Sequence, residues 1–172
     1  MKHGNIQKLT LTGAFAALTA IATLLIQIPS PTKGYINCGD ALVNLSAWVL
    51  GGAYGAAAAG IGSAMADLIS GYTVYAPATL IIKAVMAVVS FAVFSRLSRS
   101  KKSFFSLLAG AAAAELVMIA GYAVFAGFLY GSAASAILSV PENIVQGVFG
   151  AAASTAVYTA VSRRSTKLNG LL

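Results

Sequence analysis

Five ionisable side chains lie inside long apolar stretches of this sequence, where charged residues are unusual: Asp40, Asp67, Lys83, Glu115 and Glu142. Burying a charge in an apolar medium costs several kcal/mol, so such residues commonly mark a ligand site, a proton path or a structural ion pair. Binding of a polar ligand, transfer of a proton and structural pairing are therefore the chemistries that these side chains can support.

No catalytic or cofactor motif accompanies these residues. The sequence lacks the phosphate loop G-x-x-x-x-G-K-[ST], the zinc motif H-E-x-x-H, the nucleophile elbow G-x-S-x-G and the pair C-x-x-C. The single cysteine, Cys38, cannot form an internal disulfide, and the single histidine, His3, lies at the N-terminus. We therefore expect no enzyme activity, no metal and no cofactor.

The composition indicates a membrane protein. Of the 172 residues, 59% are hydrophobic and 9% are charged, whereas soluble domains carry about 25% charged residues. The net charge of +7 could suggest nucleic-acid binding, but the basic residues form short clusters beside apolar runs, which is the topology signal of a membrane protein. We predict an all-α membrane protein in which residues 1–172 form one domain in the lipid bilayer and bind no nucleic acid.

Four apolar runs are long enough to cross a bilayer, since a crossing needs about 20 apolar residues. They are residues 9–28, 76–95, 104–130 and 141–161. The first run exceeds the apolar region of a secretory signal, which has about 7 to 15 residues, so we interpret it as a retained helix. A further run, residues 39–71, is too long for one crossing and short for two.

Basic clusters decide how often the chain crosses. Lys and Arg favour the cytoplasmic side, which requires an even number of crossings between any two clusters. Residues 39–71 must then cross twice, turning near Gly51 and Gly52. We predict six transmembrane helices with both termini cytoplasmic, and outer connections at residues 29–38, 71–75 and 131–140. The clusters are Lys2 and Lys8; Arg96, Arg99, Lys101 and Lys102; and Arg163, Arg164 and Lys167.

This topology places most of the ionisable residues in the outer half of the membrane. Asp40 and Glu142 begin their helices at the outer side, and Asp67 lies near an outer helix end. Lys83 lies roughly 9 Å below the outer end of its helix at 1.5 Å per residue, and Glu115 alone is near the middle. The amide and phenol side chains at the same outer depth are Asn37, Asn44, Tyr72, Tyr75, Tyr122, Tyr130, Asn143 and Gln146.

The shared depth predicts a polar pocket that opens to the outside, with aromatic walls suited to a small, flat ligand. Structural explanations stay open for each residue. Asp40 and Glu142 could complement helix dipoles, and Asp67 and Lys83 could form an ion pair. Glu115 could be protonated and hydrogen-bonded inside the bundle, and the tyrosines could form an interfacial belt. The predicted substrate-binding residues are Asn37, Asp40, Asp67, Tyr75, Lys83, Glu115, Tyr122, Asn143 and Gln146.

Small residues recur four positions apart in the first apolar run, at Gly13 and Ala17 and at Ala16 and Ala20. Such stripes allow helix backbones to approach closely in lipid. We predict a partner interface at these four residues, with packing inside the same bundle as the alternative.

Several segments together resemble the S components of energy-coupling factor (ECF) transporters. The similarity extends over nearly the whole chain, and the combination of these segments is more specific than any one of them. The segments are residues 39–45 (GDALVNL), 50–55 (LGGAYG), 60–72 (GIGSAMADLISGY), 76–83 (APATLIIK) and 141–146 (PENIVQ).

The resemblance implies a substrate-binding subunit in a bacterial plasma membrane. Such a subunit captures a vitamin outside the cell and releases it inside with a transmembrane T-component and two cytoplasmic ATPase subunits. In this family the T-component contacts small residues of the first helix, which match Ala16 and Ala20 with Gly13 and Ala17 beside them. The family's pocket uses the loop after the first helix and the last three helices, which here carry residues 29–38, Tyr75, Lys83, Glu115, Tyr122, Asn143 and Gln146.

The sequence looks closest to the branch for riboflavin, hydroxymethylpyrimidine and pyridoxine. The predicted pocket has few bulky aromatic side chains, since Trp48 is expected near the cytoplasmic half, so we favour a single-ring pyridoxine or hydroxymethylpyrimidine type over riboflavin. Two other functions stay open: a self-contained proton-coupled transporter that uses Glu115, and a structural membrane protein whose buried charges hold helices together.

Overall fold

The computed structural model describes residues 3–30, 34–98 and 104–169, and side chains within 5–30, 34–98 and 104–163. The described residues form six helices and one pair of short strands, which confirms the predicted all-α class. The elements are α1 (His3–Leu25), β1 (Gln27–Pro29), β2 (Tyr35–Asn37), α2 (Gly39–Leu50), α3 (Gly52–Ile69), α4 (Ala76–Leu97), α5 (Phe104–Tyr130) and α6 (Ala133–Asn169).

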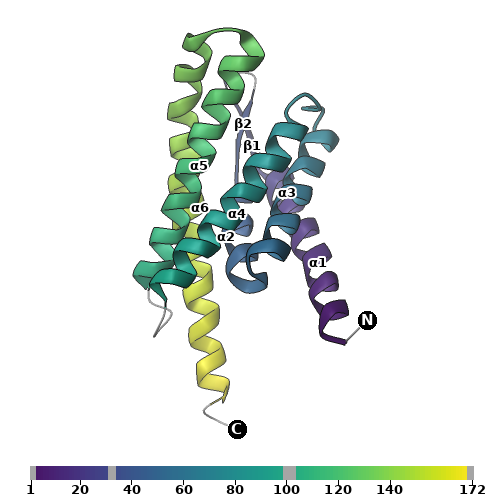
Figure 1. Ribbon diagram of the computed structural model, residues 1–172, viewed down its shortest axis with the longest axis vertical. Coiled ribbons are helices and arrows are strands. Elements are labelled where there is room, and N and C mark those ends of the chain that lie inside the picture. Colours follow the sequence, from purple (N-terminus) through teal and green to yellow (C-terminus); the bar gives the residue numbers. More distant parts are fainter. Residues whose placement is uncertain (1–2, 31–33, 99–103, 170–172) are drawn as a thin grey trace.

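The helices form a bundle around the short helix α2, which contacts α1, α3, α4 and α6. Figure 1 shows α5 and α6 side by side at one flank, α1 and α3 at the other, and α4 running obliquely between the two flanks. The N-terminal end of α1 and the C-terminal end of α6 lie at the same end of the bundle. This arrangement leaves the β1–β2 hairpin between the two flanks, towards the opposite end.

Four helices are long and apolar enough to cross a membrane: α1, α4, α5 and α6. The 12 residues of α2 extend only about 18 Å at 1.5 Å per residue, short of the roughly 30 Å hydrocarbon core. The predicted break between α2 and α3 is confirmed at Gly51, whose φ of 86° favours glycine. Six crossings and cytoplasmic termini stay predictions.

The segment after α1 is a hairpin in the structure. α1 ends at Leu25, and Gln27 pairs with Asn37 in an antiparallel ladder, so the predicted helix over residues 9–28 is too long at its C-terminal end. Pro29 lacks a backbone N–H and cannot continue a helix interior without a lost hydrogen bond. The predicted non-helical connection therefore begins earlier than expected.

The predicted outer connection over residues 131–140 is wrong, because α6 begins at Ala133 and continues through Pro141. Gly131 supplies the turn with a φ of 60°, and the Ser132 hydroxyl accepts a hydrogen bond from the Ala134 backbone N–H at 3.2 Å. This N-terminal cap starts the helix upstream of the proline. Glu142 consequently lies in the helix interior. Its predicted position at the start of a helix is wrong, and the alternative in which it complements the helix dipole there is excluded.

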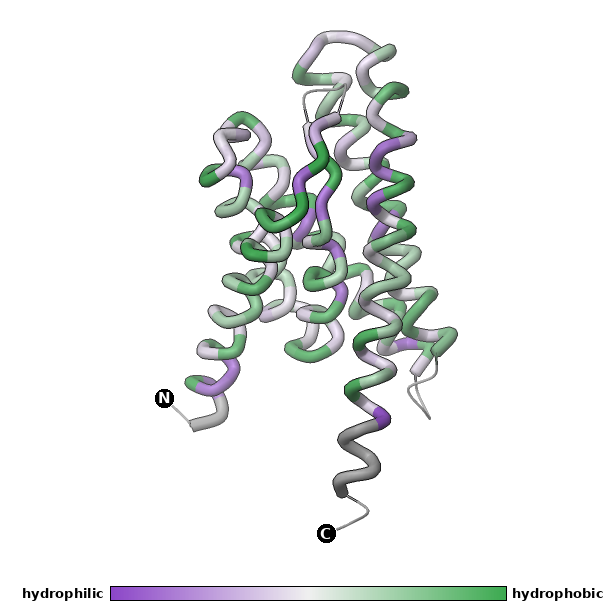
Figure 2. Tube along the Cα trace, turned by 180° about the vertical axis from the view of Figure 1, so that it is seen from behind, coloured by the Kyte–Doolittle hydropathy of each residue, from purple (hydrophilic) through white to green (hydrophobic). Residues whose placement is uncertain are grey.

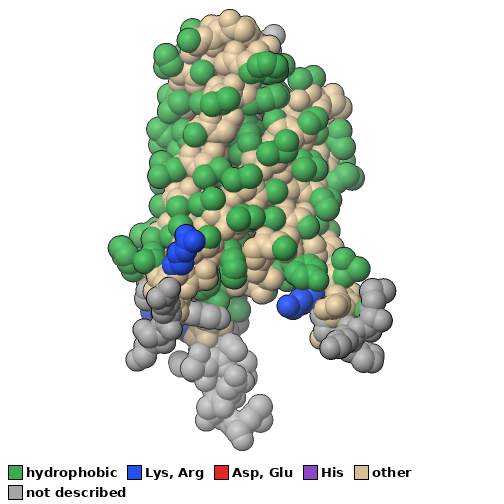
Figure 3. Space-filling view, viewed as in Figure 1, with side chains coloured by type: hydrophobic (Ala, Val, Ile, Leu, Met, Phe, Trp, Pro, Cys, Tyr) green, Lys and Arg blue, Asp and Glu red, His purple; other side chains and the backbone are tan. Residues whose placement is uncertain are grey.

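The outside of the bundle is largely apolar, as lipid requires. Figure 3 shows hydrophobic side chains over most of one face and basic side chains only near one end. Lys8, Arg96 and Arg163 are exposed, whereas Lys2, Arg99, Lys101, Lys102 and the side chains of Arg164 and Lys167 lie outside the described parts. Figure 2 shows hydrophilic positions on the hairpin and on the segments beside it.

The small residues of α1 divide into two rows. Gly13 and Ala17 are exposed, whereas Ala16 and Ala20 are half-buried. A Cβ atom on Gly62 of α3 would lie 2.3 Å from the Ala16 carbonyl oxygen, so the α1 and α3 backbones are in direct contact there. The Ala16 row thus packs inside the bundle, which is the alternative left open by the sequence.

We expect Gly62→Ala to lower the free energy of unfolding by about 1–3 kcal/mol, because the added methyl group has no space against Ala16. Equilibrium unfolding in mixed detergent micelles measures this change. Gly13→Ala is the matched control, since nothing lies within 4 Å of a Cβ atom there. Equal stabilities of the two variants would contradict the close α1–α3 contact.

Candidate ligand-binding site

A pocket lies between the hairpin and helices α3 to α6, with Thr23 of α1 at its edge. Its empty volume is about 590 Å³, a figure that includes space open to solvent. Seven of the nine predicted binding residues line it: Asn37, Asp67, Tyr75, Lys83, Tyr122, Asn143 and Gln146. Asp40 and Glu115 lie outside its lining.

Several lining residues are not among the predicted binding residues. Tyr72 and Glu142 had the right depth but were not chosen. Gly34 and Tyr35 lie within residues 29–38, the loop that the resemblance assigned to the pocket without naming these two residues. Small hydroxyl side chains in an apolar helix are too common to indicate a binding site. For Ser63 the spacing was the available signal, since it precedes Asp67 by about one helical turn and so shares its helix face. The unselected lining residues are Thr23, Gly34, Tyr35, Ser63, Tyr72, Thr79, Ala126, Ser139 and Glu142.

A buried ion pair lies at the inner side of the pocket. The Lys83 ammonium contacts Asp40 Oδ1, and the side chains are 3% and 0% exposed. Gln146 donates to Asp40 Oδ2 at 2.7 Å, so both carboxylate oxygens have partners. The predicted alternative in which Lys83 pairs with Asp67 is wrong.

The same network reaches the hairpin. The Oε1 atom of Gln146 accepts hydrogen bonds from the Asn37 backbone N–H at 2.9 Å and from the Asn37 side-chain amide at 3.2 Å. Asn37 Oδ1 in turn accepts from the Gly39 backbone N–H at the start of α2. Strand β2 is therefore bonded to α6 and, through Gln146, to the ion pair between α2 and α4.

Aromatic side chains form one wall of the pocket. The ring centroids of Tyr35 and Tyr72 are 4.7 Å apart, those of Tyr72 and Tyr75 are 6.3 Å apart, and those of Tyr75 and Phe125 are 5.3 Å apart. The Tyr75 and Tyr130 hydroxyls share a hydrogen bond at 3.0 Å. This connected row extends from β2 to α5, and its members Tyr35, Tyr72 and Tyr75 line the pocket.

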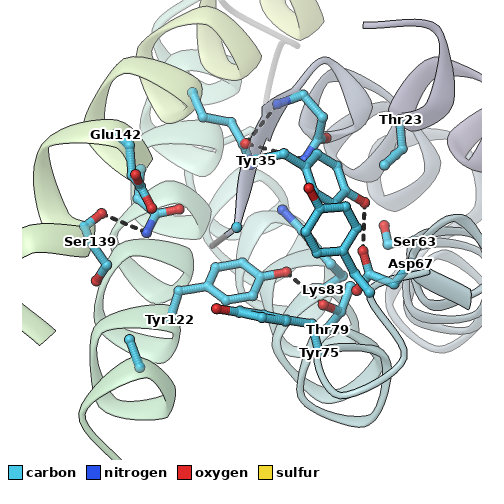
Figure 4. A pocket seen from close by; sticks show the side chains of 16 residues that line it. Thr23, Tyr35, Ser63, Asp67, Tyr75, Thr79, Lys83, Tyr122, Ser139 and Glu142 are labelled. Atoms are coloured by element: carbon cyan, nitrogen blue, oxygen red, sulfur yellow. Dashed lines mark hydrogen bonds between the residues drawn. The ribbon is translucent and has the colours of Figure 1, made fainter. Parts of the chain in front are cut away.

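Tyr122 joins the aromatic wall to the ion pair. Its hydroxyl shares a hydrogen bond with Thr79 at 3.0 Å, and the Lys83 ammonium lies 5.5 Å from the centroid of its ring. Figure 4 shows Tyr122, Thr79 and Lys83 on one side of the pocket space. The hydrogen bond of its hydroxyl and the ammonium over its face thus both restrict the orientation of the Tyr122 ring.

On the opposite flank, β2 is bonded to α3. The Tyr35 hydroxyl donates to Asp67 Oδ1 at 2.5 Å. Burial, followed by the hydrogen bond and the charge of Asp67, raises the pKa of the Tyr35 hydroxyl above its ordinary value. Tyr35 therefore stays a neutral donor across the physiological pH range.

The geometry of this site can be set beside known proteins. A family model described as the S component of ECF-type riboflavin transporters matches residues 3–163. The chain belongs to this family. The predicted membership is thereby confirmed, and the chain is a substrate-binding subunit of a membrane transporter, not an enzyme.

Two similar proteins accompany that match. An uncharacterized protein in gap 3'region of Pyrococcus woesei is 36% identical over 131 residues, which cover 76% of this S component and 84% of the relative. The solved structure of the S component of a bacterial ECF transporter has a TM-score of 0.70 and 18% identity, and the match covers 92% of this chain and 97% of that one. The second comparison shows a shared fold.

A second polar layer of the S component lies outside the pocket lining. Glu115 Oε1 accepts from the Asn44 amide at 3.0 Å, and Asn44 Oδ1 accepts from Ser90 at 2.7 Å. A Cβ atom on Gly150 would lie 2.7 Å from the Asp40 Cβ and 3.0 Å from Glu115 Oε1. Glycine at this position therefore lets α6 approach both acids.

An aromatic cluster belongs to the core of the same bundle. Trp48 lies 5.9 Å from Phe94 and 5.5 Å from Tyr158 between ring centroids. Phe94 is near the end of α4 that carries exposed Arg96. Trp48 thus lies towards the basic end of the bundle, on the side where the sequence analysis expected it.

We expect Lys83→Met to lower the free energy of unfolding by about 3–5 kcal/mol, because it leaves the Asp40 carboxylate buried without its counter-charge. Equilibrium unfolding in mixed micelles measures the loss. The control is the double variant Asp40→Asn with Lys83→Met, which removes both charges and should be more stable than the Lys83→Met single variant. If the double variant loses as much free energy of unfolding as Asp40→Asn and Lys83→Met lose together, the pairing is contradicted.

Proposed function

We propose that this S component captures a small, flat heteroaromatic vitamin or vitamin precursor from outside the cell. The observation that carries the proposal is the pocket itself, which has an aromatic row on one wall and buried polar groups on the others. The proposal includes a single domain over residues 1–172, six crossings of the plasma membrane and cytoplasmic termini. The pocket then opens outward, away from the basic end.

The candidate ligands are pyridoxine, hydroxymethylpyrimidine and riboflavin. All three combine a planar ring system with hydroxyl or amino groups, which suits a pocket lined by Tyr75, Tyr122, Asn143 and Gln146. The sequence favoured a single-ring compound, whereas the matching family is described by riboflavin. We therefore propose the heteroaromatic class as a whole and treat the ring size as an outcome of the binding measurement.

The charges of the pocket favour a ligand that is not an anion. Asp67 and Glu142 line it as acids, and the only basic side chain in its described lining is Lys83, which is already paired with Asp40. A phosphate group would bring negative charge next to these carboxylates in a weakly screened environment. The pocket should therefore prefer a free vitamin to its phosphate ester.

Isothermal titration calorimetry of the purified protein in detergent tests this proposal. The ligands are pyridoxine, hydroxymethylpyrimidine and riboflavin, each beside its phosphate ester. We expect one vitamin to bind at a 1:1 ratio and its phosphate ester to bind at least about 10-fold more weakly, a difference of about 1.4 kcal/mol. Failure of all three vitamins would refute the ligand class, and a tighter phosphate ester would refute the charge argument.

We further propose that a T-component docks on the exposed row of α1 and that two ATPase subunits supply the energy for release inside. Gly13 and Ala17 are exposed on this row, and no atom lies within 4 Å of a Cβ atom on Gly13. Small residues of this kind allow another helix to approach closely in lipid. The half-buried Ala16 row is already used by α3.

Gly13→Leu should therefore weaken assembly with the T-component several-fold without changing vitamin binding, because the added side chain blocks close approach only from outside. Co-purification of the tagged complex from membranes measures assembly. Val124→Leu is the control, since Val124 is an exposed apolar residue on α5. Normal assembly of Gly13→Leu would rule out docking on this row.

A further inference from the structure

Two side chains of α3 bring unsatisfied oxygens to the pocket wall. Ser63 and Asp67 line the pocket and are only 2% and 4% exposed. Ser63 Oγ and Asp67 Oδ2 have no hydrogen-bond partner among the described residues. Figure 4 shows the two side chains together on one flank, with Ser139 and Glu142 on the other flank.

Buried polar atoms without partners are rare in folded proteins, since each costs desolvation free energy that no bond returns. Asp40 and Lys83 show the usual pattern, because both Asp40 oxygens and the Lys83 ammonium are bonded. Among the described residues, Trp48 Nε1, Glu115 Oε2 and Thr155 Oγ1 also lack a partner, but none of these three residues lines the pocket. Two neighbouring exceptions at the wall of one pocket therefore point to a partner that arrives with the ligand.

The orientation of Asp67 is already set by the hairpin. The Tyr35 hydroxyl donates to Oδ1 at 2.5 Å, and the Thr79 hydroxyl also interacts with this carboxyl group, whereas Oδ2 has no hydrogen-bond partner in the described part of the chain. Ser63 lies about one helical turn before Asp67 on α3, so its hydroxyl belongs to the same flank. The wall consequently presents a fixed acceptor beside a hydroxyl that can donate or accept.

We propose that Ser63 and Asp67 form a specificity subsite that accepts a hydrogen-bond donor on the edge of the ligand, such as a ring N–H, an amino group or a hydroxyl group. This inference rests on the proposed vitamin-binding function and deepens it. It assigns a role in recognition to α3, a helix outside the pocket elements that the family resemblance implied. The ligand class narrows to heterocycles that carry a donor on the edge facing α3.

Asp67→Asn tests the subsite by reversing the polarity of one atom. The Tyr35 hydroxyl needs an acceptor, so the new amide oxygen takes the place of Oδ1 and the amide nitrogen takes the place of Oδ2. A donor then faces the donor of the ligand. Because the lost hydrogen bond is replaced by two donors that face each other, we expect affinity for the vitamin to fall roughly 10- to 100-fold.

The experiment is a double-mutant cycle between protein and ligand, in which calorimetry measures each binding affinity. The probes are whichever of pyridoxine, hydroxymethylpyrimidine or riboflavin binds the wild type, and its derivatives in which each N–H or O–H is methylated in turn. One methylated derivative should bind the wild type more weakly than the parent vitamin does. In Asp67→Asn the difference in affinity between the parent and this derivative should largely disappear. Ser63→Ala should lower affinity for the parent by a smaller factor.

Ser95→Ala is the matched control, because Ser95 is an exposed serine on α4 whose hydroxyl donates to the Ala92 carbonyl. Elution as a monodisperse peak shows that each variant is folded. If Asp67→Asn and Ser63→Ala both bind the parent vitamin and its derivatives with the same affinities as the wild type, the subsite is refuted while the vitamin-binding function stands. If no vitamin binds the wild type, the proposed function and the subsite fail together.

Discussion

The contact between Asp40 and Lys83 holds together the elements that surround the pocket. The pair joins α2 to α4, Gln146 adds α6, and Asn37 extends the same network to the hairpin. The desolvation cost of two buried charges is offset only when both are paired and hydrogen-bonded. Few arrangements of the helices allow this. The positions of the lining residues on α4 and α6 follow from that restriction.

Close helix approach is the second constraint, and glycine provides it. Gly62 brings α3 against the Ala16 carbonyl of α1, and Gly150 brings α6 against Asp40 and Glu115. On α1, the face with Ala16 is therefore packed against α3, whereas the face with Gly13 stays exposed. The pocket, the packed core and the proposed docking row can therefore coexist in a short chain.

Sequence patterns predicted much of this arrangement, because charges are rare in an apolar chain and their depth follows from helix geometry. Asp67, Lys83 and Gln146 were placed at a common depth in this way. The partner of Lys83 could not be predicted, since pairing depends on helix rotation and on Tyr35 occupying Asp67. The start of α6 was missed because Pro141 gave a stronger signal than the Ser132 cap.

The most direct test of the account is the identity of any small molecule that stays bound during purification in mild detergent. The protein would be denatured and the released compound identified and quantified by mass spectrometry. We expect a planar heteroaromatic vitamin or precursor without a phosphate group, at close to one molecule per chain. Release of a phosphorylated or aliphatic compound at that ratio would contradict it.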